Sequence, residues 1–160
     1  MKFSILIFAF FILITGCSAI ACNKEDNSIK TDSNIMDNNN DSMTGSTIRI
    51  KVGSKTFTAT LLDNNSARAF KELLPLTISM TELNGNEKYY DLSKSLPTNS
   101  SSPGNIKNGD LMLYGSRTLV LFYKGFSTSY SYTRLGTVND ASGLAAALGS
   151  ANVTVTFELE

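Results

Sequence analysis

The sequence predicts a small, mainly β domain that closes into a barrel of about eight strands, with two short helices capping its ends. Three features of the chain support this fold class. Apolar and polar residues alternate in many short segments, turn residues separate these segments, and no long alternation of strands with helices occurs. Small antiparallel sheets lose their exposed edges most completely when they close into a barrel.

The individual elements follow from this alternation and from the turn residues between segments. Gly53-Ser54 joins the first two strands in a tight hairpin, and Pro75 ends a short helix that side chains of residues 63–66 can cap. Asn84-Gly85 marks another turn, and Gly149 ends the second helix. The expected elements are strands 48–52, 56–61, 76–80, 87–90, 111–114, 119–123, 135–138 and 153–159, and helices 67–74 and 144–148.

The segment 111–132 is predicted to form the centre of the domain. It contains two apolar strands joined at a Gly-Ser turn, and the apolar run 119–123 is short enough for a strand buried on both sides. Phe126, Tyr130 and Tyr132 then occur where a solvent-exposed loop would usually be polar. These rings are therefore expected either to close the end of a core or to line a groove.

The composition excludes several classes of function. The chain contains no histidine, which removes Ser-His-Asp and Cys-His catalysis and the commonest zinc ligand. Lys+Arg and Asp+Glu both number 14, so the formal net charge is zero, and no basic patch indicates nucleic acid as a partner. No glycine-rich phosphate loop or metal-ligand spacing occurs. The sequence therefore predicts no catalytic residues, no metal, no cofactor and no nucleic-acid partner.

The amino-terminal segment has the pattern of an export signal. Met1-Lys2 precedes about a dozen apolar residues, too few to span a bilayer as a permanent helix. The sequence Ile14-Thr15-Gly16-Cys17 resembles the lipobox of bacterial lipoproteins, which are cleaved before the cysteine and acylated on it. We therefore expect residues 1–16 to be a lipoprotein signal peptide and Cys17 to be the lipidation site. The alternative is an ordinary secretory signal cleaved at Ala19-Ile20-Ala21.

Residues 17–46 are expected to be the lipidated cysteine and a disordered tether. The part of this stretch from Asn23 to Ser46 is rich in Asn, Asp and Ser and has too few apolar residues to bury a core. Roughly 25 residues of such chain span on the order of 25–30 Å, which would hold the folded domain, residues 47–160, just off a membrane surface. Ser18 is not an aspartate retention signal. We therefore expect a lipid-anchored protein of the bacterial cell envelope, at the outer membrane or the cell surface.

The predicted domain resembles the bacterial cyclophilin-like domain family. The likeness covers residues 48–157, and the order of strands and helices is also similar to the cyclophilin-like fold. It is carried by four blocks, ELLPLTISMTELNGNEKYYDL, LPTNSSSPGNIKNGDLMLYG, LVLFYKGFSTSYSYTRLGTV and ALGSANVTVTF. The resemblance implies a small closed barrel, whereas the biochemical role of that family is poorly defined.

True cyclophilins are peptidyl-prolyl isomerases, so the resemblance raises this activity as an alternative. In those enzymes an arginine stabilises the twisted peptide, aromatic residues hold the proline ring, and a histidine typically takes part. This chain has no histidine, and neither Arg117 nor Arg134 stands in a Phe-His-Arg context. Prolyl isomerisation needs only an apolar pocket and one donor, so the missing histidine does not exclude it.

The aromatic residues around the central strands are the candidate binding residues for a peptide, a protein or a small ligand. We expect a non-catalytic binding module, with a divergent isomerase that uses Arg134 or Arg117 as the alternative. A purely structural module, with the rings buried in packing, is the third possibility. The candidate residues are Phe122, Phe126, Tyr130, Tyr132 and Arg134.

Two other segments bear on the site. The turn-rich stretch 96–108 is expected to form a long surface loop, of a kind that often borders a binding site. Glu87 and Lys88 are adjacent on a predicted strand and so point to opposite faces, which argues against an acid–base pair. We expect both to be solvated charges.

Overall fold

The computed structural model describes residues 46–160. The predicted signal peptide (1–16), the predicted lipidation site Cys17 and all but the last residue of the predicted tether (17–46) lie outside the described residues. No helix within residues 46–160 has the length and apolar character needed to cross a membrane. The elements are β1 (Thr47–Val52), β2 (Lys55–Leu61), α1 (Asn65–Lys71), β3 (Leu76–Leu83), β4 (Glu87–Asp91), β5 (Asn105–Ile106), β6 (Asp110–Tyr114), β7 (Thr118–Phe122), β8 (Phe126–Ser127), β9 (Tyr132–Val138), α2 (Leu144–Leu148) and β10 (Val153–Leu159).

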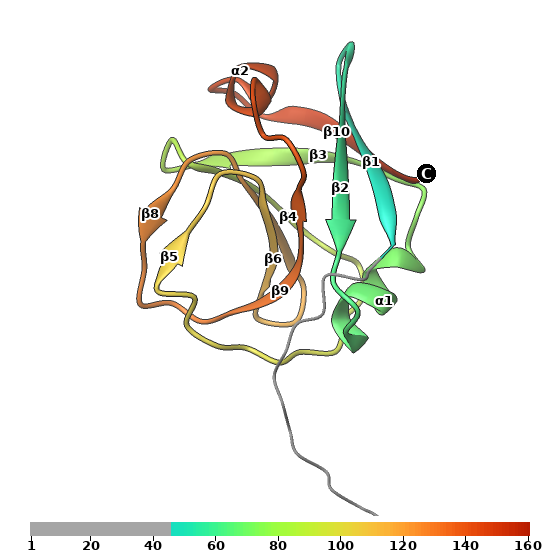
Figure 1. Cartoon of the computed structure of the whole chain (residues 1–160), viewed down its shortest axis with the longest axis vertical. Helices are drawn as coiled ribbons and strands as arrows, with labels where there is room; N and C mark the ends of the chain where they lie inside the picture. The colour runs from blue at the N-terminus through green and yellow to red at the C-terminus, as the bar shows by residue number, and fades with distance from the viewer. Residues whose placement is uncertain (1–45) are drawn as a thin grey trace, which may run out of the picture. The chain divides into compact units, whose positions relative to one another are not determined.

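Eight strands form a closed antiparallel barrel in the order β1-β10-β3-β4-β7-β6-β9-β2 (Figure 1). The first and last strands pair with each other, from Ile48 opposite Leu159 to Val52 opposite Val155, so no barrel strand is left with an open edge. The predicted mainly β barrel is therefore confirmed. Since every barrel strand lies within residues 46–160, this segment contains its own complete core.

Three boundaries differ from the prediction by three residues, and one small sheet was missed. β3 ends at Leu83 rather than at residue 80. β9 begins at Tyr132 rather than at residue 135, because Tyr132, Thr133 and Arg134 pair with β6. α1 ends at Lys71 rather than at residue 74. β5 and β8 form a separate two-stranded sheet that was not predicted, since strands of two residues are too short to show alternation.

β9 carries a bulge where it bends around the barrel. Leu111 pairs with Gly136 and Met112 pairs with Arg134, so Leu135 is the extra residue on β9. Leu135 is fully buried in the barrel interior. A side chain at Gly136 would clash with the backbone of Thr60 on β2, so glycine is what allows the two strands to approach this closely.

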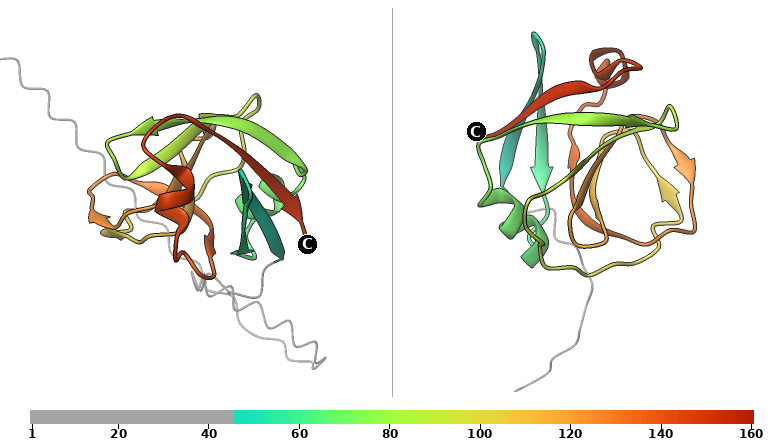
Figure 2. Two further views of the ribbon diagram at one scale, coloured as in Figure 1. Left: turned by 90° about the horizontal axis from the view of Figure 1, so that it is seen from above. Right: turned by 180° about the vertical axis from the view of Figure 1, so that it is seen from behind.

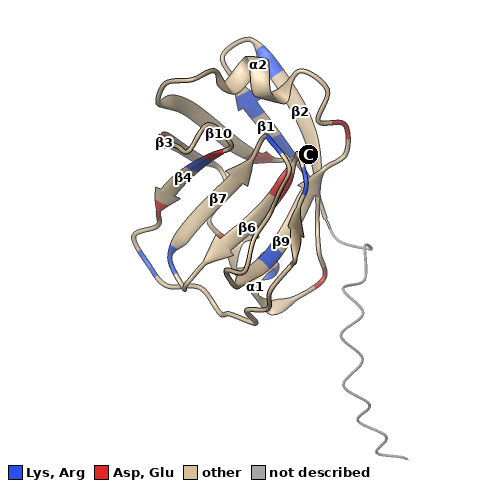
Figure 3. Cartoon of the chain, turned by 90° about the vertical axis from the view of Figure 1, so that its left-hand side faces the viewer, with Lys and Arg blue, Asp and Glu red and all other residues tan. Residues whose placement is uncertain are grey.

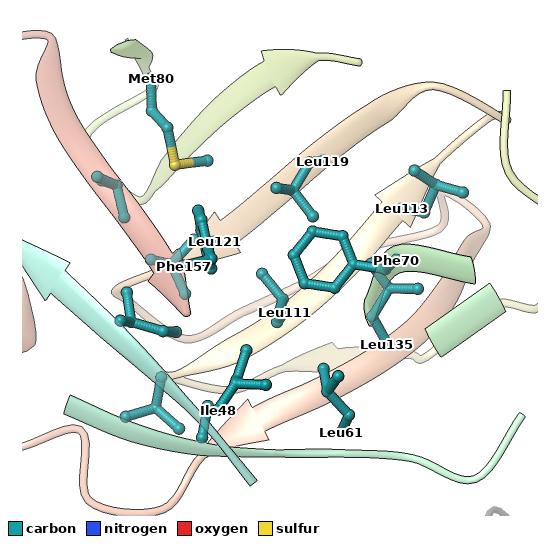
Figure 4. Close-up of a cluster of buried hydrophobic side chains, with 14 of the residues drawn as sticks. Ile48, Leu61, Phe70, Met80, Leu111, Leu113, Leu119, Leu121, Leu135 and Phe157 are labelled. Carbon is teal, nitrogen blue, oxygen red and sulfur yellow. The ribbon is translucent and has the colours of Figure 1, made fainter. Parts of the chain in front are cut away.

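The barrel interior is filled by one large group of apolar side chains, which we call the inner cluster (Figure 4). Phe70 of α1 is fully buried and meets Phe157 of β10 edge to face, with ring centroids 5.7 Å apart. Leu144 and Leu148 of α2 join the same cluster. The two helices lie at opposite ends of the domain (Figures 1 and 2), as predicted for capping helices.

Asn64 fixes α1 to the barrel. Its side-chain oxygen accepts a hydrogen bond of 2.8 Å from the Ala67 N–H, which caps the helix. Its side-chain nitrogen donates to the Arg134 carbonyl oxygen at 3.0 Å, on β9. One polar side chain therefore starts the helix and ties it to the strand that carries the bulge.

A fully buried lysine lies at the end of the barrel next to α2. Lys88 Nζ donates to the Glu82 carboxylate, to the Gly149 carbonyl oxygen at 2.8 Å and to the Ala151 carbonyl oxygen at 2.7 Å. These three acceptors match the three donors of an ammonium group. Nζ also lies 5.3 Å from the centre of the Tyr123 ring, and the Tyr123 hydroxyl donates to Glu82 at 2.9 Å. The ammonium group is therefore fully partnered.

The same contacts set the protonation of this group of residues. Burial acts to raise the pKa of the Glu82 carboxyl, but hydrogen bonds from Lys88, Tyr123 and the Gly85 N–H outweigh it, so the pKa is lowered. Burial, followed by the hydrogen bond to Glu82, raises the pKa of Tyr123 to about 12. Glu82 is therefore held as a carboxylate and Tyr123 as a phenol.

The prediction that Glu87 and Lys88 are solvated is wrong, because their exposed fractions are 8% and 0%. Their opposite orientation is confirmed. Lys88 lies opposite Leu121 of the inner cluster and faces the barrel interior, where it donates to two carbonyl oxygens of the loop between α2 and β10. Glu87 faces the outside of the sheet, where other residues cover it.

Replacing Lys88 with methionine should destabilise the domain by about 3 kcal/mol, because Glu82 would remain as a partly buried carboxylate without its counter-ion. Urea unfolding of residues 46–160 measures the loss. Lys51→Met is the matched control, since Lys51 forms an ion pair with Glu158 but is 44% exposed, and it should have a much smaller effect. Equal losses in the two variants would contradict the structural role of Lys88.

Candidate functional site

β6 and β7 are apolar on both faces, which determines where the site lies. The predicted double-sided burial of the run from Leu119 is confirmed as far as Phe122. The inward side chains of β6 and β7 belong to the inner cluster. The outward ones need a cover of their own, and they form a second buried group, the outer cluster, which consists of Ile106, Met112, Val120, Phe122 and Tyr132.

Two loops cover the outer cluster. The long loop predicted at 96–108 supplies β5, and the segment after β7 supplies β8; Ile106 pairs with Phe126 between them. Ser101 and Tyr132 exchange two backbone hydrogen bonds of 3.0 Å each, so the long loop is also fastened to the start of β9. These pairings hold apolar side chains over the outer face of β6 and β7.

A row of contacting aromatic rings runs from this cover to the surface. Phe126 contacts Phe122 and Phe122 contacts Tyr132, with ring centroids 5.7 Å and 5.6 Å apart. Tyr132 contacts Tyr114 at 5.5 Å, and Tyr114 meets Tyr130 edge to face at 6.1 Å. Phe122 is fully buried, whereas Tyr114 and Tyr130 are 47% and 63% exposed. The row therefore begins in the packing and ends in solvent.

A pocket of about 340 Å³ opens where the cover ends, and we call it the tyrosine pocket. Four of the six tyrosines of the chain line it. Strand alternation explains its composition, because every second residue of β4 faces this side of the sheet. The lining residues are Leu83, Glu87, Tyr89, Asp91, Tyr114, Thr118, Val120, Tyr130 and Tyr132.

The charged residues of the tyrosine pocket are both acidic. In Figure 3, which shows β4, β7, β6 and β9 side by side, β6 and β7 are tan over most of their length, whereas β4 carries blue and red segments. Burial, followed by repulsion from Glu82, raises the pKa of the Glu87 carboxyl above its ordinary value. Burial, followed by the charge of Glu87, also raises the pKa of Tyr132. Asp91 accepts a hydrogen bond of 2.6 Å from the Thr118 hydroxyl.

The structure brings together four of the five predicted ligand-binding residues and separates the fifth. Tyr130 and Tyr132 line the tyrosine pocket, and Phe122 and Phe126 pack in the row beneath it. Arg134 lies on β9 opposite Met112 and is not part of the pocket lining. The sequence left two alternatives for these rings, closing the end of a core or lining a groove. Phe122 and Phe126 pack in the outer cluster, whereas Tyr130 and Tyr132 line the pocket.

Neither of the arginines considered for an isomerase lies at the tyrosine pocket. The Arg117 guanidinium donates to the Leu92 carbonyl oxygen at 2.9 Å, on the turn side of β7. The lining contains no lysine or arginine from residues 46–160. The electrostatic character of this pocket is therefore acidic, and the donors available inside it are phenol and threonine hydroxyls.

Tyr114, Tyr89, Glu87 and Asp91 were missed as site residues in the sequence. Glu87, Tyr89 and Asp91 recur at every second position of β4, and this period was a usable signal. That this face of β4 lies at the same pocket as Tyr130 could not be predicted, because it depends on the pairing of β4 with β7, which are distant in the sequence. Within residues 46–160, no group of three or more His, Cys, Asp or Glu side chains is arranged to hold a metal ion.

Replacing Glu87 with glutamine should stabilise the domain at neutral pH. The pKa of Glu87 is raised on folding, so its contribution to stability is complete below the ordinary value of 4.5 and is lost as pH rises through the folded value. The advantage of Glu87→Gln over the natural domain, measured by urea unfolding, should therefore grow from below pH 4.5 to neutral pH. Glu82→Gln is the control of opposite sign, since the pKa of Glu82 is lowered. A pH-independent effect of Glu87→Gln would contradict this account.

Comparison with known proteins agrees with this fold. A sequence profile of the cyclophilin-like family matches residues 50–158, and no curated protein sequence matches the chain. The solution structure of a hypothetical protein from Archaeoglobus fulgidus is similar, with a TM-score of 0.57 and 16% identity, and the match covers 76% of this chain and 99% of that one. At this identity the likeness supports the fold alone. The profile match spans most of the described domain, and the chain therefore belongs to the cyclophilin-like family.

Proposed function

We propose that the domain is a non-catalytic binding module, which takes up a small ligand or a short peptide segment in the tyrosine pocket. The observation that carries this proposal is the exposed end of the aromatic row. Tyr130 keeps 63% of its surface in solvent beside a concave, tyrosine-lined pocket. Binding pockets typically combine aromatic walls with a few polar groups, and their volumes are roughly 300–1,000 Å³.

The rigidity of the pocket floor also supports binding. Val120 and Tyr132 belong to the buried outer cluster, and Tyr132 is bonded through its backbone to Ser101. Tyr114 and Tyr130 are the pocket rings with the largest exposed fractions. A largely pre-formed pocket keeps the entropic cost of binding low.

We further propose that the domain is exported and lipid-anchored through Cys17, on a tether that ends where the barrel begins. The support is the sequence pattern at residues 1–17 and the polar composition that follows it. A binding module at the cell surface would meet ligands from outside the cell.

Tyr130→Ala should weaken ligand binding by about tenfold while leaving the fold intact, because the ring contributes pocket wall but little buried packing. The measurement is an NMR screen of a fragment library against residues 46–160, which selects compounds that shift the Tyr114 and Tyr130 signals. Tyr130→Phe is the matched control and should retain binding, since it keeps the ring.

Two results would contradict a non-catalytic module at this pocket. One is a set of fragments whose affinities do not change in Tyr130→Ala. The other is turnover of a prolyl peptide in a protease-coupled assay that Arg117→Ala or Arg134→Ala abolishes, because this would identify a divergent isomerase. The proposal predicts a rate equal to the uncatalysed baseline.

Cys17→Ala should abolish lipidation of the chain expressed in a bacterial host, because it removes the acylated sulfur of the proposed lipobox. Metabolic labelling with an alkyne fatty acid measures this. Cys22→Ala is the matched control and should be labelled like the natural chain. Loss of label in Cys22→Ala, with label retained in Cys17→Ala, would place the anchor at the second cysteine instead.

A further inference from the structure

The tyrosine pocket combines aromatic walls with a carboxylate that has no counter-charge. Glu87 is more than nine-tenths buried, and it lines the pocket beside Tyr89 and Asp91 on the same face of β4. Within residues 46–160, the ion pairs involve Glu158, Asp63 and Glu82 and not Glu87, and the Glu87 carboxylate oxygens are not among the buried atoms sealed from solvent. Burial without a partner makes the charged form of Glu87 costly, which is why its pKa is raised, and a bound cation would offset that cost.

The nearest cation along the chain cannot supply that charge. Lys88 faces the opposite side of β4, and its ammonium group is already committed to Glu82 and to two carbonyl oxygens beside α2. The pocket lining includes no basic residue of the described chain. The second carboxylate, Asp91, uses one oxygen for the Thr118 hydroxyl and adds negative charge at the other end of the same strand.

The walls of the pocket favour the same kind of ligand. The face of a tyrosine ring carries negative electrostatic potential and attracts cations within about 6 Å of its centre. Tyr114 meets Tyr130 at an interplanar angle of 85° and Tyr132 at 52°, so the rings are inclined to one another and form more than one wall. The raised pKa of Tyr132 keeps that ring a neutral phenol. Inclined aromatic walls above a carboxylate are the chemistry that recognises organic ammonium ions.

We propose that the tyrosine pocket binds an organic cation, an alkylammonium or quaternary ammonium group, whose charge is paired with Glu87 and whose alkyl groups contact Tyr89, Tyr114, Tyr130 and Tyr132. This inference rests on the proposed binding function and specifies the class of ligand. The volume of the tyrosine pocket, about 340 Å³, suits an ammonium group with a short chain. Asp91 contributes a second, more exposed negative charge at the rim.

A pair of probes of equal shape separates charge recognition from simple apolar binding. Choline and its neutral carbon isostere, 3,3-dimethylbutan-1-ol, are titrated into residues 46–160, and Tyr130 and Tyr114 signals are followed by NMR. Nα-acetyl-lysine amide is the third probe, and it distinguishes the ammonium group of a peptide side chain from that of a free small molecule. The expected result is that one of the two cations binds at least about tenfold more tightly than the neutral isostere.

Variants locate the charge that is responsible. Glu87→Gln keeps the size of the side chain and should weaken the cation by about tenfold without changing the affinity of the neutral isostere. Asp91→Asn should have a smaller effect of the same kind. Glu72→Gln, at the exposed end of α1, is the matched control and should bind all three probes like the natural domain.

The outcomes separate this inference from the proposed function on which it rests. Equal affinities for choline, the lysine amide and the neutral isostere would overturn cation recognition while leaving a pocket that binds ligands. Cation binding that Glu87→Gln leaves unchanged would overturn the assigned role of Glu87. If none of the three probes shifts the pocket tyrosines while library fragments do, the cation inference fails and the binding function stands.

Discussion

The constraint on which the structure depends is that β6 and β7 are apolar on both faces. Their inward leucines complete the barrel core, while Met112, Val120 and Phe122 face outward and would be exposed in a bare barrel. The chain solves this with two loops that pair through Ile106 and Phe126 and lie across the outer face. The tyrosine pocket lies where this cover ends, so the candidate site is a consequence of how the second apolar face is buried.

The alternation of β4 separates two kinds of charge. Lys88 faces inward, where it pairs with Glu82 and donates to two carbonyl oxygens that follow α2. These hydrogen bonds join β4 to the end of the barrel. Glu87 faces outward into the tyrosine pocket, where residues 46–160 provide no cation. Lys88, which pairs with Glu82, and Glu87, which lines the pocket, are neighbours in sequence but lie on opposite sides of the sheet. A substitution of Glu87 therefore need not disturb the barrel.

Much of the fold could be predicted because barrel strands alternate and their turns carry typical residues. Asn84 and Gly85, for example, both have the positive φ that a tight hairpin requires. The site was predictable only in part. Tyr130 and Tyr132 stood out as aromatic residues in a loop, whereas the contribution of Glu87 depends on long-range pairing of β4 with β7. The burial of Lys88 escaped prediction because two of its three acceptors are backbone carbonyl oxygens, which no side-chain pattern reveals.

The most direct test of this account is a solution NMR measurement of ring-to-ring contacts in residues 46–160. The account predicts nuclear Overhauser effects between Phe122 and Phe126 and between Tyr114 and Tyr130, whose ring centroids are 5.7 Å and 6.1 Å apart. It also predicts shifted methyl signals for Met112 beneath the cover. Random-coil shifts for residues 123–131, without these ring contacts, would show that the outer face is not covered in this way and would remove the basis for the tyrosine pocket.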